Sequence, residues 1–291
     1  MRIAHFHNTN DGRPWSPVLP IRRAISREIT RMYANAVLAC SRAALATAPR
    51  RRGSLADAVI TCGIDTEKYM AQTRDPRLRR SLSISEDAPV VGHVGRFVPQ
   101  KNHEGLIETL KFLRQAVPNV CLVLVGDGPV KPAIERQVAS NGLSAHVRFL
   151  GARTDVERIL PIFDALCFPS LYEGLPIAVL EARMGGIPVV ASSIPQIEEA
   201  LEGCNGSTLI EPGNYREFAS ALARYLNNGK RISPPEDWVS RFSREHSAIR
   251  LASFYSELLR AARFRTPSPV PFTGVAPARN APRSQAGKLA E

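Results

Sequence analysis

The feature that most constrains the fold is a regular alternation of short apolar runs and helical patterns between residues 87 and 230. The apolar runs lie at 89–94, 120–125, 147–150, 165–168, 187–191 and 207–210, and helical patterns lie at 102–116, 132–140, 156–160 (capped by Thr154), 176–184 and 214–226. This alternation predicts right-handed βαβ units and a doubly wound parallel α/β sheet, Rossmann-like in type. Ligands of such sheets bind beyond the carboxyl ends of the strands, so the residues that follow each strand are the first candidates for a site.

The rest of the chain is less regular. A weak strand at 2–6, a basic helix at 20–33 and short strands at 36–39 and 59–60 predict an incomplete, Rossmann-like N-terminal portion over residues 1–69. The polar stretch 70–86 predicts a linker to the main domain, 87–230, and residues 231–265 contain a terminal helix at 245–262. The Pro/Ala/Ser-rich residues 266–291 cannot bury a core and are expected to be disordered.

Composition excludes several classes of protein. A length of 291 residues predicts about two domains, and 44% hydrophobic with 22% charged residues is ordinary globular composition. The sequence contains no run of 18 apolar residues that would predict a membrane span, and the start of the chain lacks the apolar core of a signal peptide. Five cysteines without a C-x-x-C pair indicate reduced thiols in a cytosol: Cys40, Cys62, Cys121, Cys167 and Cys204.

The net charge of +11 is unevenly distributed. Residues 1–80 carry 15 Lys and Arg against six Asp and Glu, whereas residues 81–230 have a small acidic excess. No zinc-finger or ribonucleoprotein motif accompanies this charge, so nucleic acid is not expected as a partner. An anionic membrane surface remains a hypothesis beside a simply solvated arginine-rich face. It rests on Arg22, Arg23, Arg27, Arg31, Arg50, Arg51 and Arg52.

A first candidate site follows the run at 89–94. Gly95 and Arg96 open a loop that leads through Lys101 into the helical pattern at 102–116. Two cations five residues apart suit an anionic diphosphate, because a helix N-terminus adds partial positive charge and free N–H groups. Arginine and lysine are also common on loops that bind nothing, so the pattern alone leaves both interpretations open.

A second candidate is the glycine turn formed by Gly126, Asp127 and Gly128. Glycine lets the backbone approach a ligand closely, although a plain tight turn is the simpler interpretation. The chain has neither the G-x-G-x-x-G pattern of dinucleotide-binding folds nor a P-loop. Neither a hydride cofactor nor an ATPase phosphate cradle is therefore indicated.

A third candidate is a pair of acids in the block 168–182. Glu173 precedes a predicted helix and Glu181 lies inside it, about two turns further on. Glu181 stands in an otherwise apolar stretch and needs a partner, because burying a lone carboxylate is costly. A vicinal diol of a ligand or a structural arginine would serve.

Together these motifs resemble a known family. Residues 88–227 are similar to the donor-binding domain of retaining glycosyltransferases of the two-Rossmann-domain (GT-B) type, family four, once called group one. The resemblance rests on G-R-x-x-x-x-K at 95–101, V-G-D-G-P at 125–129, V-x-F-L-G at 147–151, F-P-S-x-x-E-G-x-P-x-x-x-L-E-A at 168–182 and G-x-P-V-V-A at 186–191. In this resemblance Glu173 and Glu181 form the family's E-x7-E pair, and residues 241–255 resemble its closing helix, which crosses back toward the first domain.

Residues 1–69 resemble only the last part of the family's acceptor-side domain. Gly63, Ile64 and Asp65 match the end of an N-G-I-D motif in which Cys62 replaces the asparagine. The family's opening strands and its Gly-rich loop near the acceptor have no counterpart. We therefore expect a truncated N-terminal domain, arising from a misplaced start, a split or decayed gene, or a partner that supplies the rest.

The resemblance implies a nucleoside-diphosphate sugar as donor and a sugar or lipid-linked sugar hydroxyl as acceptor, with retention of configuration. It gives catalytic roles to Glu173, Arg96 and Lys101 and implies no metal or other cofactor, because the cations would offset charge on the leaving diphosphate. The ribose would bind Glu181, the transferred sugar would bind Glu173, and the base would lie near the glycine turns. The implied donor site comprises Gly95, Arg96, Lys101, Gly126, Asp127, Gly128, Gly151, Arg153, Glu173, Gly174, Leu175, Pro176 and Glu181.

Three other functions compete with this hypothesis. The principal alternative is a catalytically inactive half that binds nucleotide sugars or acts as a scaffold. A sugar-nucleotide epimerase shares the two-domain shape, but the F-P-S-L-Y-E-G-L-P block argues against it. A glycoside hydrolase also uses two carboxylates, but it has no diphosphate for Arg96 and Lys101 to hold. The expected location is the cytoplasm, with attachment to the inner face of a membrane as a hypothesis.

Overall fold

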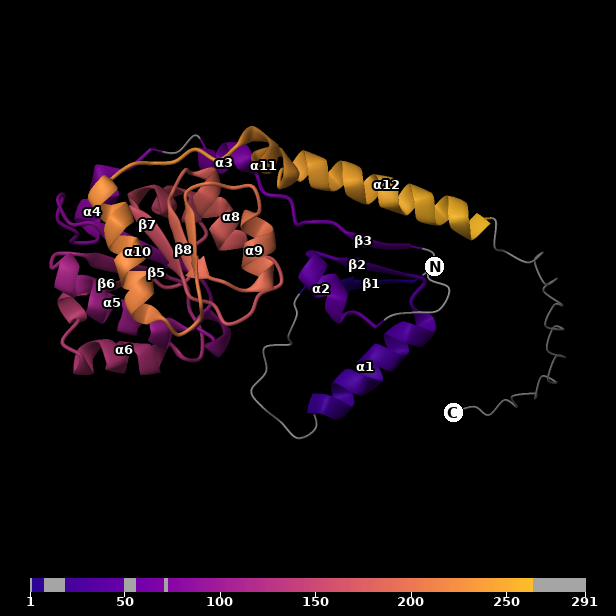
Figure 1. Ribbon diagram of the computed structural model, residues 1–291, viewed down its shortest axis with the longest axis horizontal. Helices are drawn as coiled ribbons and strands as arrows, with labels where there is room; N and C mark the ends of the chain where they lie inside the picture. The colour runs from indigo at the N-terminus through magenta and orange to yellow at the C-terminus, as the bar shows by residue number, and fades with distance from the viewer. Residues whose placement is uncertain (1, 8–18, 50–55, 71–72, 264–291) are drawn as a thin grey trace, which may run out of the picture.

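The computed structural model describes residues 2–7, 19–49, 56–70 and 73–263, which form a large and a small α/β part (Figure 1). The large part is built on a parallel six-stranded sheet of order β6-β5-β4-β7-β8-β9. Its strands are β4 (Val90–Val94), β5 (Cys121–Val125), β6 (Val147–Phe149), β7 (Ala165–Phe168), β8 (Val189–Ser192) and β9 (Ser207–Ile210). The predicted doubly wound α/β fold is confirmed.

Helices cover both faces of this sheet because its strands are apolar on both sides. Neighbouring β4 residues point to opposite faces, so Val90 belongs to one buried cluster and Val91 to the other. The Val91 face carries α5 (His103–Ala116), α6 (Lys131–Ser140) and α10 (Tyr215–Asn228), and the Val90 face carries α7 (Val156–Ile159), α8 (Ile177–Met184), α9 (Pro195–Leu201) and α11 (Glu236–Arg241). These two layers fix the strand ends on which the candidate site depends.

The stretch predicted as a polar linker contains structure of its own. Asp75 caps α4 (Pro76–Ser81), where its side chain accepts a hydrogen bond from the Arg77 backbone N–H. Arg79 is buried and donates to the carbonyls of Ser85 and Ala88. A polar sequence therefore packs onto the large part because the guanidinium satisfies backbone carbonyls that burial would otherwise leave unpaired. The domain boundaries themselves stay predictions.

Other differences from the predicted elements are local. The helix expected to be capped by Thr154 begins after Asp155, and no side-chain hydrogen bond caps it. Strand β3 covers Ala56–Val59 rather than 59–60, and β8 begins at Val189 rather than 187. Short elements were not predicted, because a segment of one or two helical turns shows too little hydrophobic periodicity. They are α2 (Arg42–Thr47), α3 (Thr66–Met70), α4, α9, α11 and the 3-10 turns at Pro99–Lys101, Ser144–His146 and Leu160–Ile162.

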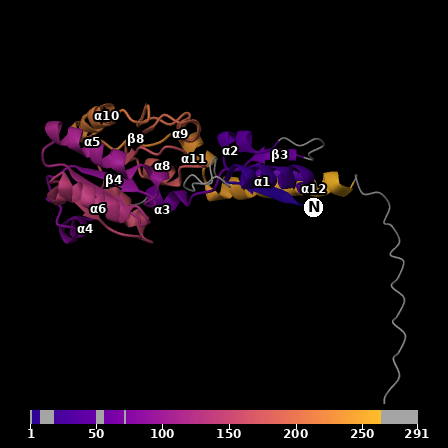
Figure 2. The ribbon, with the colours of Figure 1, turned by 90° about the horizontal axis from the view of Figure 1, so that it is seen from below.

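The small part is a parallel sheet of order β1-β2-β3, with β1 at Ile3–Phe6, β2 at Ala36–Ala39 and the long helix α1 at Leu19–Tyr33. The terminal helix α12 (Arg244–Arg263) runs from the large part along this sheet (Figures 1 and 2). Its Phe254 and Leu258 pack against Leu38 and Ile60. Helix α12 therefore contacts the small part, and the assignment of residues 231–265 as a crossing unit stays a prediction. The predicted tail at 266–291 lies outside the described residues.

Backbone contacts join the two parts where the chain passes between them. Ile64 donates to the Phe242 carbonyl at 2.8 Å and accepts from the Arg244 N–H at 3.0 Å, forming a parallel bridge. On α9, the Glu199 carboxylate accepts the backbone N–H groups of Arg42 and Ala43 at the start of α2. An acid at a helix N-terminus stabilises it, so α9 caps a helix of the other part.

Gly92 in β4 gives a test of this packing. A Cβ atom at this position would lie 2.0 Å from the Phe163 ring, so Gly92→Ala is expected to cost about 3 kcal/mol or more of unfolding free energy through overpacking. Urea denaturation measures this cost. Gly142→Ala is the control, because no atom lies near its Cβ and only its left-handed backbone opposes the change, at about 1 kcal/mol. Equal costs at the two positions would refute the packing argument.

Candidate active site

The loops after four neighbouring strands are joined by hydrogen bonds at the carboxyl edge of the large sheet. Gly95 N–H donates to the Val125 carbonyl at 2.9 Å, and Gly126 N–H donates to the Gly151 carbonyl at 2.8 Å. Leu171 N–H, after β7, donates to the Gln100 carbonyl at 2.9 Å. Strands β5 and β6 lie on one side of β4 and β7 to β9 on the other. The loops after β4 and β7 therefore flank the switch point at which doubly wound folds bind ligands.

The glycines at 126 and 128 are required by contacts between these loops. A Cβ atom on Gly126 would lie 2.0 Å from the Gly95 carbonyl oxygen, and one on Gly128 would lie 2.4 Å from the Phe97 carbonyl oxygen. Both glycines have positive φ angles, 139° and 156°. These glycines therefore let the backbone after β5 approach the loop after β4 closely.

Lys101 and Glu173 form an ion pair across the switch point. The Lys101 Nζ lies 2.7 Å from Glu173 Oε1, and the two side chains are only 16% and 4% exposed. Gln100 Nε2 donates to Glu173 Oε2 at 3.2 Å. A second link comes from Asn102, whose Nδ2 donates to the Pro169 carbonyl at 3.1 Å. The sequence predicted that Lys101 and Glu173 share a site but missed this direct pairing and the parts played by Gln100 and Asn102.

Two other predicted cations are placed differently. Arg96 is exposed at the rim of the loop after β4, where an anion can reach it. Arg153 forms a bidentate ion pair with Asp155, with nitrogen–oxygen distances of 2.8 and 2.7 Å. The Arg153 guanidinium is thus held beside its own loop. Asp127 likewise binds locally, accepting the Gly128 N–H at 2.7 Å.

Glu181 lies on α8, which begins shortly after Gly174, Leu175 and Pro176. Its Oε1 accepts the Tyr69 hydroxyl hydrogen at 2.5 Å. Burial raises the pKa of Glu181, and the hydrogen bond from Tyr69 opposes that increase. The structural partner that the sequence required is thus a phenol of α3 rather than an arginine, and nothing in the spacing of the motif could have identified it.

A buried aromatic cluster supports the loop that carries Lys101. His103 stacks on Phe97 with ring centroids 3.9 Å apart and meets His93 edge-on at 4.8 Å. Lys101 Nζ lies 4.8 Å above the Phe168 ring. Burial lowers the pKa of His103 to about 4 and that of His93 well below 6.5. Both histidines are therefore neutral at pH 7, which leaves Lys101 as the cation of this cluster.

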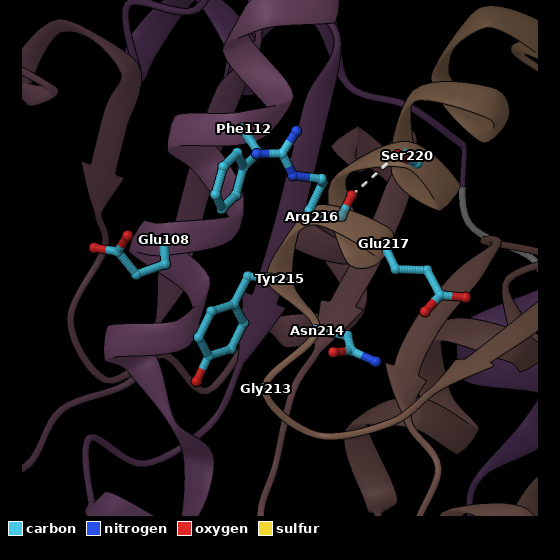
Figure 3. Close-up of a pocket in the computed structure, with 8 residues that line it drawn as sticks. All are labelled: Glu108, Phe112, Gly213, Asn214, Tyr215, Arg216, Glu217 and Ser220. Atoms are coloured by element: carbon cyan, nitrogen blue, oxygen red, sulfur yellow. Dashed lines mark hydrogen bonds between the residues drawn. The ribbon is translucent and has the colours of Figure 1, made fainter.

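A separate groove of about 830 Å³ lies between α5 and α10 (Figure 3). The Arg216 guanidinium lies over the Phe112 ring, 4.9 Å from its centroid. Tyr215 also lines the groove, and its hydroxyl lies 3.4 Å from Asn102 Nδ2. None of the residues predicted to hold a donor lines this groove.

The strand order and the loops at the switch point are those of Rossmann-type, ligand-binding α/β domains. The sequence profile of the family named glycosyl transferases group 1 matches residues 74–240, and the chain belongs to this family. The resemblance inferred from the motifs is thereby confirmed.

Individual relatives agree with this assignment. A putative glycosyltransferase of Bacillus subtilis, EpsF, is 32% identical over 242 residues, which are 79% of this chain and 61% of the relative. An Escherichia coli UDP-Gal:alpha-D-GlcNAc-diphosphoundecaprenol alpha-1,3-galactosyltransferase is 31% identical over 174 residues, 58% of this chain and 45% of the relative. The chain therefore spans about half to three-fifths of the length of these curated relatives.

Solved structures share the fold. Anabaena HepE, crystallised in complex with UDP and glucose, superposes with a TM-score of 0.71 and 25% identity over 87% of this chain and 71% of that one. Its complex with UDP-glucose gives the same TM-score with 26% identity. The similarity extends over both the large and the small part.

The buried histidines give a test of the site's support. The pKa of His103 is about 4 in the fold and ordinarily 6.5. Protonation of His103 therefore lowers the free energy of unfolding by about 3 kcal/mol as the pH falls from about 6.5 to about 4. His103→Phe keeps the ring but removes the titration. We expect urea unfolding of this variant to lose less stability between pH 7 and pH 4.5 than the wild type. Parallel pH dependences would contradict a neutral, buried His103.

Proposed function

We propose that this protein transfers a sugar, with retention of configuration, from a nucleoside-diphosphate sugar to an acceptor hydroxyl in polysaccharide or glycolipid assembly. The observation that carries the proposal is the Lys101–Glu173 ion pair at the switch point of a group 1 glycosyltransferase domain. Lys101 and Glu173 compensate each other's charge. A cation and an acid are therefore both held in one site that is largely shielded from water.

The proposed roles follow from where the side chains lie. Arg96, exposed at the rim, and Lys101 bind the diphosphate together with the start of α8 at Gly174 and Leu175. Charge that develops on the departing diphosphate is stabilised by cations already in position, so we propose no requirement for a metal. Glu173, oriented by Lys101 and Gln100, accepts hydrogen bonds from hydroxyls of the transferred sugar.

We propose a uridine diphosphate sugar as donor and a lipid-linked sugar as acceptor. HepE was crystallised with UDP and with UDP-glucose, and the Escherichia coli relative is named for a UDP-sugar and a diphosphoundecaprenol acceptor. Glu181 then binds the ribose hydroxyls through its carboxylate. The alternative is a half that binds the donor without transferring its sugar. Incubation with UDP-glucose distinguishes the two functions, because only a transferase releases UDP by transferring glucose to an acceptor or, slowly, to water.

The ribose role of Glu181 predicts the effect of Glu181→Ala. Removing a carboxylate that accepts hydrogen bonds from a ligand costs about 2–3 kcal/mol, so we expect UDP affinity to fall roughly 30- to 150-fold. Isothermal titration calorimetry with UDP measures it, and thermal unfolding verifies that the variant folds.

Glu135→Ala is the matched control, because Glu135 is an exposed acid on α6, a helix that contributes no predicted site residue. Its UDP affinity should equal that of the wild type. Unchanged affinity in Glu181→Ala would refute the ribose role, and absence of UDP binding by the wild type would refute the choice of nucleotide.

We also propose that α1 attaches the protein to an anionic membrane surface. No helix among the described residues is long and apolar enough to cross a bilayer, but α1 presents an apolar stripe about three turns long. Its large side chains are half exposed: Ile21, Ile25, Ile29 and Met32. Arg22, Arg27 and Arg31 lie on the same helix, where basic residues beside an apolar face favour anionic interfaces. Arg50–Arg52 of the same hypothesis lie outside the described residues.

Sedimentation with vesicles tests this second proposal. The wild type should bind vesicles containing phosphatidylglycerol, bind phosphatidylcholine vesicles less, and dissociate from the phosphatidylglycerol vesicles as salt rises. Ile25→Asp should weaken binding several-fold by breaking the stripe. Ile249→Asp is the control, since Ile249 is an equally exposed isoleucine on α12. Equal loss from both variants, or no binding at low salt, would end the proposal.

A further inference from the structure

Tyr69 and Glu181 come from different segments of the chain yet meet closely. Tyr69 lies on the short helix α3, and its hydroxyl donates to Glu181 Oε1 at 2.5 Å. Among the described residues Tyr69 is the one side chain that hydrogen-bonds to this carboxylate. Helices α3 and α8 also pack together: the Tyr69 carbonyl oxygen lies 3.5 Å from where a Cβ atom of Gly185 would be.

The hydrogen bond engages one oxygen of Glu181 and leaves Oε2 for another partner. A carboxylate has about four lone-pair sites on its two oxygens, so a phenol on Oε1 does not prevent hydroxyls of a ligand from binding to Oε2. Without such a bond, the Glu181 side chain would rotate about its own torsions and would lose conformational entropy when a ligand binds. A donor that already holds one oxygen removes most of that cost.

We propose that Tyr69 is a positioning residue that orients the Glu181 carboxylate toward the ribose of the donor. This inference rests on the proposed function, because it needs Glu181 to bind ribose. Tyr69 itself touches no reacting atom in this scheme and acts through Glu181. It also ties the donor site to the connection between the two parts, since it lies five residues after Ile64, which bridges to Ser243.

The charges around the pair agree with this role. Burial raises the pKa of Glu181, whereas the Tyr69 hydroxyl and the Lys68 ammonium lower it and Glu157 of α7 raises it. Lys68 is itself paired with Glu157 at 3.3 Å. Burial and the bond to Glu181 raise the pKa of Tyr69, with further increases from Glu157 and Asp65. Tyr69 therefore remains a neutral donor, and its hydrogen bond helps to keep a buried acid ionised.

Tyr69→Phe tests the proposal because it removes the hydroxyl and keeps the ring. Loss of a hydrogen bond to a charged group leaves the Glu181 carboxylate less well oriented, so we expect UDP affinity to fall roughly tenfold at pH 7.5, measured by calorimetry. The pKa of Glu181 rises further without the donor, so the loss of affinity on acidification should begin at higher pH than in the wild type. Tyr225→Phe is the control, because it removes a hydroxyl bonded to Thr208 elsewhere in the domain.

A second substitution separates positioning from folding. In Glu181→Ala the carboxylate that Tyr69 orients is gone, so adding Tyr69→Phe to it should lower UDP affinity less than twofold. Loss of the same size in both backgrounds, or an unchanged pH profile in Tyr69→Phe, would show a merely structural role and overturn the proposal. If Glu181→Ala weakens UDP binding and Tyr69→Phe does not, the inference alone fails; if neither weakens it, the proposed ribose role fails as well.

Discussion

The arrangement of the candidate site depends on the ion pair between Lys101 and Glu173. The two residues are far apart in the sequence, on the loops after β4 and β7, and the pair holds those loops together where the sheet changes winding direction. Both charges are nearly buried, a condition that is tolerated only when geometry and further hydrogen bonds compensate for lost hydration. Gln100 supplies one such bond, and the neutral state of His93 and His103 below the loop keeps a second cation away from Lys101.

Much of the large part could be predicted because its elements are long and strictly periodic. Apolar strands such as 121–125 and the helix after Asn102 carry their own signals, and the glycine at 126 marks a close approach between loops. The contents of the supposed linker could not be predicted, since the burial of Arg79 depends on carbonyls of Ser85 and Ala88 that only the folded chain brings to it. Polar composition alone does not distinguish a solvated segment from one in which a buried guanidinium binds backbone carbonyls.

The sequence proposed the members of the candidate site, and those memberships stay predictions. Motif spacing assigned Arg96, Lys101, Glu173 and Glu181 to one site, but spacing says nothing about which cation meets which acid. The pairing of Arg153 with Asp155 and of Glu181 with Tyr69 depends on rotamers and on the packing of α3 against α8. Family membership, in contrast, follows from local motifs in order, and it is the inference that the comparisons confirm most directly.

The bridge between Ile64 and Ser243 has a mechanical consequence. The chain passes between the large and the small part twice, and backbone hydrogen bonds join these two passages. The two passages are thus paired with each other, so a change in the path of one must be accommodated by the other. The Glu199 carboxylate of α9 adds a further contact between the parts, at the start of α2.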